Sequence, residues 1–205
     1  HDGISVLPED AVPGTKAADY YHLESDFLIE VDITPNRSDA CSHYGVARDL
    51  YAWLVQNGYK TSLHRPSDEA FKVDNNDLPI RVTVENNEAC PRYAAVSLKN
   101  CRVGESPEWL KTRLTTIGLR PINNIVDITN YIMMAYGQPL HCFDADMVKD
   151  HHIIVKTMPE GTPFVTLDGE EHKLSDHDLA ICNSPEPMCN AGEFGGKGRE
   201  TYETT

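Results

Sequence analysis

The apolar residues of this chain change their spacing along its length, and this feature most constrains the fold. Ile80, Val82 and Val84 alternate with polar residues, as in a half-buried strand. Apolar residues then follow helical spacing over 124–136, and short strand-like runs return between 153 and 191. Because this order is mixed and is not a repeated strand–helix–strand unit, it predicts an α+β fold.

End signals mark three expected helices. Ser38 is a good N-cap for a helix that Asn57-Gly58 would end. Ser106-Pro107-Glu108 supplies an N-cap, a proline at the first helical position and an acid. The third helix should cover 124–136 and end at the following glycine.

Strands are expected where β-formers cluster between turn signals, with a hairpin at Asp168-Gly169. Besides the strand that begins at Ile80, these runs are 27–33, 93–98, 153–157, 163–167, 179–182 and 188–191.

The 205 residues suffice for one large domain, or for one domain with part of another. Residues 1–24 are rich in turn signals and are interpreted as a linker. The polar stretch 64–78 separates two differently patterned units, so we expect a domain boundary there, with 25–77 on one side and 78–205 on the other.

Composition excludes several classes of protein. With 40% hydrophobic and 24% charged residues, the chain can bury a core. It has no apolar run of membrane-spanning length and no signal peptide pattern at its start. Its six cysteines form no C-x-x-C pair, and we expect most to be buried thiols in a reducing cytosol. A net charge of −14 excludes a broad electrostatic footprint on RNA, so any RNA contact must be a small site.

Two loop residues are candidates for chemistry. His141, in Gly137-Gln138-Pro139-Leu140-His141, could bind a substrate carbonyl or orient a water molecule, or could only satisfy loop backbone groups. Arg120 could bind a phosphate or a ribose, or could only pair with Asp127 or cap the preceding helix. Asp127 and Asn130 could support a site or simply bond neighbouring loops.

A glycine-rich stretch, 188–198, could let a backbone approach a ligand closely. It lacks the spacing of a P-loop. Metal binding near His141 is disfavoured, because zinc and hard cations need a better-defined ligand set.

Five ordered strings of the sequence resemble phenylalanyl-tRNA synthetase beta subunits. They are Glu30-Val31-Asp32-Ile33-Thr34-Pro35-Asn36-Arg37-Ser38-Asp39, Cys90-Pro91-Arg92-Tyr93, Ser106-Pro107-Glu108-Trp109, Val126-Asp127-Ile128-Thr129-Asn130-Tyr131 and Gly137-Gln138-Pro139-Leu140-His141.

The resemblance implies a domain organisation. Residues 1–24 would be a linker from an inserted OB-fold, and 25–77 the second half of a small split α+β module with its following linker. Residues 78–205 would be a layered β/β/α editing domain that is incomplete at its C-terminal end.

The resemblance also implies a function: hydrolysis of the ester in tyrosyl-tRNA(Phe), made by mischarging. His141 would be the catalytic residue, and Arg120, Gly192, Gly195 and Gly196 would bind substrate. Partners would be the acceptor end of tRNA(Phe) and an alpha subunit, in a cytoplasmic heterotetramer of two alpha and two beta chains. The segment itself would hold no cofactor, whereas the complete synthetase would use ATP and Mg²⁺. An alternative is a non-catalytic structural or tRNA-binding module of the same beta chain.

Overall fold

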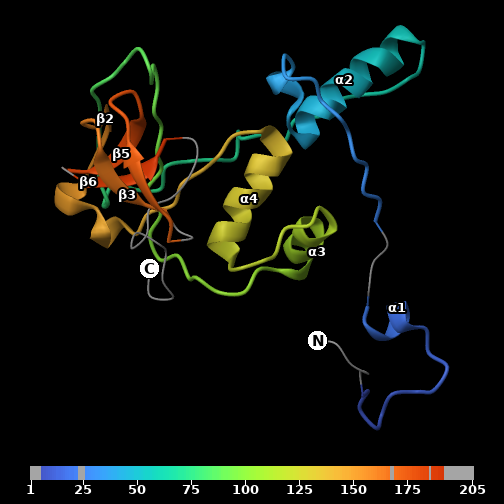
Figure 1. The fold of residues 1–205 in the computed structure, drawn as a ribbon. Helices are drawn as coiled ribbons and strands as arrows, with labels where there is room; N and C mark the ends of the chain where they lie inside the picture. The colour runs from blue at the N-terminus through green and yellow to red at the C-terminus, as the bar shows by residue number, and fades with distance from the viewer. Residues whose placement is uncertain (1–5, 23–25, 167–168, 185, 192–205) are drawn as a thin grey trace. The chain divides into compact units, whose positions relative to one another are not determined.

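The computed structural model describes residues 6–22, 26–166, 169–184 and 186–191. The chain divides into two compact units, His1–Val31 and Asp32–Thr205. The first contains the short helix α1 (Ala17–Tyr20), and the second contains every strand and every other helix of the described residues (Figure 1). The fold is mixed α+β, as predicted from the sequence.

Helix α2 (His43–Gln56) confirms the helix expected after Ser38, but its predicted N-cap is wrong. Ser38 instead opens the single turn η1 (Ser38–Ala40), and the Ser42 hydroxyl oxygen accepts the Gly45 N–H at 2.9 Å as the true cap. Arg37 makes ion pairs with Asp39 and Asp49, which tie the turn to the helix. The cap therefore lies four residues later than the sequence suggested.

Helices α3 (Glu108–Thr116) and α4 (Asn124–Tyr136) pack against each other (Figure 1). The rings of Trp109 and Tyr131 meet edge to face, 5.6 Å between centroids, while Leu110 and Leu114 are buried. Both expected helices are confirmed. However, Pro107 occupies the N-cap position of α3 without a side-chain cap, so the predicted cap at Ser106 is wrong.

The main sheet has the strand order β1-β2-β5-β6. Strand β1 (Arg81–Val84) is parallel to β2 (His152–Thr157), and β5 (Leu179–Asn183) is antiparallel to both β2 and β6 (Glu186–Asn190). A parallel pair needs a long crossover. Here the crossover contains α3, α4 and the loop that carries His141. The candidate site loop therefore lies in the connection between two paired strands of the main sheet.

A hairpin of β3 (Thr162–Val165) and β4 (Glu171–Leu174) forms the second sheet. Phe164 and Leu174 from this hairpin form a buried apolar cluster with Ala180 and Cys182 of β5. Val155, Ile181 and Met188 belong to a second buried cluster, together with Val148, Ile153 and Cys189. The main sheet thus contributes to two apolar cores, one of which it shares with the hairpin.

Two strand predictions are wrong. The described residues of 27–33 and those of 93–98 form no strand, and the side chains of Phe27, Ile29, Val96 and Leu98 are exposed. An alternation of apolar and polar residues leads to a strand only where a partner strand is available for hydrogen bonding. Strand β4 was missed because Glu171-His172-Lys173 is polar and only Leu174 is buried. The hairpin predicted around Asp168-Gly169 is confirmed by the β3–β4 pairing.

The stretch 64–78 has no helix or strand. The rings of Tyr44 in α2 and Tyr136 in α4 lie 5.9 Å apart, so a contact does join the residues on either side of it. A domain boundary within 64–78 stays a prediction. None of the helices in the described part of the chain is long and apolar enough to cross a membrane.

Candidate functional site

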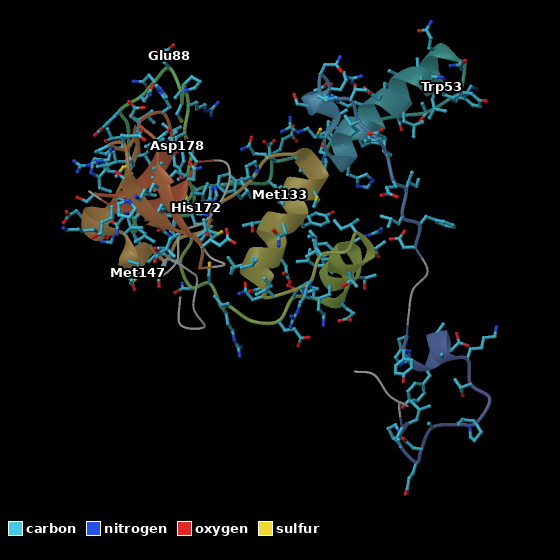
Figure 2. The ribbon with its side chains drawn as sticks, in the orientation of Figure 1. Trp53, Glu88, Met133, Met147, His172 and Asp178 are labelled. Atoms are coloured by element: carbon cyan, nitrogen blue, oxygen red, sulfur yellow. The ribbon has the colours of Figure 1, made fainter. Side chains whose placement is uncertain are left out.

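The loop 137–144 is anchored at both ends. Gly137 ends α4 in the left-handed conformation, at φ 75°, and its N–H donates to the Met133 carbonyl at 2.7 Å. A side chain there would be strained, which explains why glycine ends this helix. At the other end, the Asp144 carboxylate accepts the Asp146 N–H at 3.0 Å and starts the turn η2 (Ala145–Met147). Figure 2 labels Met133 on α4 and Met147 in η2, which flank the loop in sequence.

His141 sits within this loop with a buried ring nitrogen. Its Nε2 atom is inaccessible to solvent and is the one buried side-chain nitrogen or oxygen of the described residues without a hydrogen-bond partner. Burial lowers the pKa of His141 below its ordinary value, because it disfavours the charged imidazolium. The ring is therefore neutral near pH 7 and offers one acceptor and one donor nitrogen.

An unpaired buried polar group costs about 1–3 kcal/mol. One alternative was that His141 only hydrogen-bonds backbone groups of its loop. Nε2 makes no such bond within the described residues, so this alternative does not hold for that atom. A ligand group that hydrogen-bonds this atom would recover that free energy, once the groups packed over it give way.

Arg120 follows α3 and is exposed. It has no hydrogen bond or ion pair within the described residues, so neither the pairing with Asp127 nor the cap of the preceding helix is formed. A free guanidinium fork at the surface remains available to a phosphate or a carboxylate. No hydrogen bond within the described residues joins Arg120 to the Nε2 atom of His141.

Asp127 bonds two neighbouring loops instead. Its carboxylate is fully buried and accepts the Ser106 hydroxyl and, at 2.9 Å, the Ile122 N–H. This fixes the segment just after Arg120 against the start of α3. Of the two roles left open for Asp127, the structure shows the loop-bonding one.

The glycines Gly192, Gly195 and Gly196 lie outside the described residues. Their approach to His141 stays a prediction, as do all the site roles expected from the sequence. The last described strand, β6, ends at Asn190, two residues before Gly192.

Sequence reasoning missed a polar surface at the ends of β1 and β2. Two open hollows, of about 590 and 360 Å³, share Asn86, Glu88 and Thr157 in their walls. Glu88 lies on the loop that leaves β1 (Figure 2). Neither hollow includes His141 or Arg120, so neither belongs to the candidate site.

The six cysteines are less buried than the sequence predicted. All six thiols are free, but only Cys182 and Cys189 are buried, so the expectation that most are buried is wrong. Within the described ranges, no cluster of three or more His, Cys, Asp or Glu side chains could hold a metal ion.

Residues 89–205, which include both Arg120 and His141, match the family model of the B3/4 domain. The chain belongs to the B3/4 domain family. Its whole length also matches phenylalanine–tRNA ligase beta subunits, which confirms the resemblance seen in the five sequence strings.

Three relatives show the range of this similarity. The beta subunit of Bacteroides fragilis is 67% identical over 205 residues, that of Porphyromonas gingivalis 57% over 206, and that of Carboxydothermus hydrogenoformans 41% over 203. Each alignment covers 99–100% of this chain and 25% of the relative. The chain carrying the B3/4 domain thus spans about a quarter of the length of these curated relatives.

Proposed function

We propose that this chain is a segment of a phenylalanine–tRNA ligase beta subunit, and that its B3/4 domain hydrolyses tyrosyl-tRNA(Phe). The observation that carries the proposal is the unpaired, buried Nε2 of His141 on a loop fixed at both ends. The similarity to phenylalanine–tRNA ligase beta subunits supports an aminoacyl-tRNA as the class of substrate.

The physical need for such a reaction follows from the substrates. Phenylalanine and tyrosine differ by one hydroxyl, and an apolar pocket rejects an added hydroxyl only about 10²-fold. A second site that hydrolyses the wrong product would raise the accuracy. An activated ester requires an oriented water molecule and no protein nucleophile.

In this proposal the neutral imidazole of His141 hydrogen-bonds the attacking water or the ester. Water adds to the ester carbonyl carbon, the bond to the ribose oxygen breaks, and tyrosine and free tRNA leave. Arg120 would contact a phosphate or the terminal ribose, and Gly192, Gly195 and Gly196 would form a wall without side chains.

The rest of the proposed assembly lies outside this segment. Charging with ATP and Mg²⁺ would occur mainly on an alpha subunit, in a cytoplasmic heterotetramer of two alpha and two beta chains. The segment itself would need no cofactor for ester hydrolysis. The acceptor end of tRNA(Phe) would be its substrate-bearing partner.

The experiment compares two histidine variants of the complete beta subunit, assembled with its alpha partner. His141→Ala should slow hydrolysis of tyrosyl-tRNA by about 10–10³-fold, typical for loss of one positioned polar group. Phenylalanine charging should stay nearly unchanged, because synthesis occurs elsewhere. His177→Ala is the matched control, since that side chain is 93% exposed in a turn before β5.

Two results would count against this role. An unchanged hydrolysis rate in His141→Ala would remove His141 from the mechanism. Equal losses of charging and hydrolysis would indicate that His141 supports only folding.

A second candidate function is a structural or tRNA-binding module without chemistry of its own. The observation that favours it is that no hydrogen bond within the described residues joins Arg120 to the Nε2 atom of His141. Hydrolysis of tyrosyl-tRNA by the complete wild-type protein distinguishes the two candidates, because a purely structural module would leave the ester intact.

A further inference from the structure

We propose that Phe143 is a positioning residue that holds the His141 imidazole in its buried orientation. This inference rests on the proposed function of His141 and extends it to a residue with no polar group of its own. Phe143 would act only through the histidine, without touching the substrate.

The contact between the two rings carries the inference. The ring centroids of His141 and Phe143 lie 6.4 Å apart, with planes only 21° from parallel. Both rings extend from the same loop, two residues apart. The planes are nearly parallel, and the separation lies within the range of about 4.5–7 Å that aromatic pairs favour.

Phe143 in turn packs against a buried core cluster. The cluster includes Val155 of β2 and Ile181 of β5, both in the main sheet. Close-packed interiors hold side chains in defined rotamers, so the core restrains the Phe143 ring. A continuous path of packed groups then runs from the sheet through Phe143 to His141.

His141 needs such a restraint because hydrogen bonds do not supply one at Nε2. A buried imidazole usually has its orientation fixed by polar partners on both nitrogens. Here Nε2 has none among the described residues, which leaves it free for a ligand. An apolar neighbour can fix the ring without occupying that nitrogen, and a polar neighbour would compete with the substrate for it.

The test compares substitutions in the complete beta subunit with its alpha partner. Phe143→Leu retains apolar volume but removes the ring, and Phe143→Tyr retains the ring. Phe164→Leu is the matched control, because Phe164 is buried in the other core cluster, on the β3–β4 hairpin. Turnover and KM for tyrosyl-tRNA hydrolysis would be measured for each variant.

A second readout follows His141 directly. NMR of histidine labelled at Cε1 gives the titration midpoint of each imidazole, and His141 is assigned by the signal that His141→Gln removes. In the wild type this midpoint should lie below the ordinary value, because the ring is buried.

Phe143→Leu should lower kcat about tenfold and leave KM within about twofold, as expected when a reacting group loses its orientation. It should also raise the His141 midpoint by about 0.5 pH units or more, because the loosened ring becomes better solvated. Phe143→Tyr and Phe164→Leu should change neither quantity appreciably.

Equal effects of Phe143→Leu and Phe164→Leu would overturn the inference, since they would reflect general loosening of the fold. An unmoved His141 midpoint in Phe143→Leu would overturn it as well. If the wild type leaves tyrosyl-tRNA intact, the proposed function fails, while the midpoints still decide whether Phe143 positions the imidazole.

Discussion

Asp127 shows how one residue can organise a region without taking part in its chemistry. Its buried carboxylate joins the Ser106 hydroxyl to the Ile122 N–H, and so links the start of α3 to the loop before α4. A buried carboxylate is costly unless its oxygens are hydrogen-bonded. Here both oxygens have a partner, so the pair of bonds should be worth more than a surface contact.

Asp127→Ala should therefore lower the free energy of unfolding by about 2–4 kcal/mol, because two charge-assisted hydrogen bonds are lost and two donors are left unpaired. Urea unfolding would measure this. The control is Asp74→Ala in the exposed stretch 64–78, which should change stability by less than about 0.5 kcal/mol. Similar losses in the two variants would contradict the role of Asp127.

At Gly45, replacement by alanine should change the free energy of unfolding in the direction opposite to the usual one. Replacing glycine with alanine inside a helix normally stabilises a protein by about 1 kcal/mol. At Gly45, however, a Cβ would lie 2.5 Å from the Asp39 carbonyl oxygen and 2.7 Å from the Ala40 Cα, and both are backbone atoms. Gly45→Ala should thus destabilise by about 1–3 kcal/mol, because η1 must move away from α2.

Thermal unfolding would test this change against Gly104→Ala. A Cβ on Gly104 would meet nothing within 4 Å, so that variant should be nearly neutral. A stabilised Gly45→Ala protein would show that η1 does not pack against α2 as described.

At the scale of elements, the buried thiols of the main sheet should make it sensitive to alkali. Burial raises the pKa of Cys189 to about 12 and that of Cys182 to about 11, and it raises the pKa of the nearby Tyr93 to about 12. The ordinary values are 9.0 for the thiols and 10.0 for tyrosine. The unfolded chain therefore loses these protons first as the pH rises.

Stability should consequently be fully present below about pH 9 and should fall as the pH rises towards 12. Cys189→Ala should make this fall shallower, because one group that titrates differently in the two states is removed. Cys41→Ala, at an exposed position, should leave the slope as it is. Urea unfolding between pH 8 and 11 would decide, and identical slopes in all three proteins would refute the role of the buried thiols.

How far the sequence predicted each element depended on whether its signals are local. Helix α4 was predicted with its observed bounds because its apolar residues follow helical spacing and Gly137 ends it, and both signals are local. The cap at Asn123, whose side chain accepts from Ile125 and Val126, was not predicted. The strand expected at 93–98 did not form, since a strand depends on a partner that local alternation cannot identify. Ser106 looked like a helix cap, but it donates to Asp127, 21 residues away.

The features of the candidate site also divide into those with local sequence signals and those that depend on distant residues. The loops that carry Arg120 and His141 were predicted from the helix ends beside them. The buried Nε2 of His141 and the ring of Phe143 beside it could not be predicted, because both depend on how the loop packs in three dimensions. The hollow between Glu88 and Thr157 was missed for the same reason, as it arises from the parallel pairing of β1 with β2.

Net charge limits how strongly the isolated chain can bind nucleic acid. Its net charge is −14, whereas proteins that grip nucleic acid release counterions through clustered Lys and Arg. Under the function proposed above, other parts of a beta subunit would have to hold the tRNA.

The isolated chain should therefore bind tRNA(Phe) only weakly, with a dissociation constant well above about 1 μM at physiological salt. Filter binding over a range of salt concentrations would measure both the affinity and its salt dependence. The dependence should be shallow, because few phosphates can be neutralised by a surface on which acids outnumber bases.

Arg120→Gln is the informative variant, since Arg120 is exposed and has no ion pair within the described residues. If Arg120 contacts a phosphate, its loss should weaken the residual binding and reduce the salt slope by about one. Submicromolar binding by the isolated chain would show instead that a local basic surface overcomes the net charge, and that the segment holds tRNA by itself.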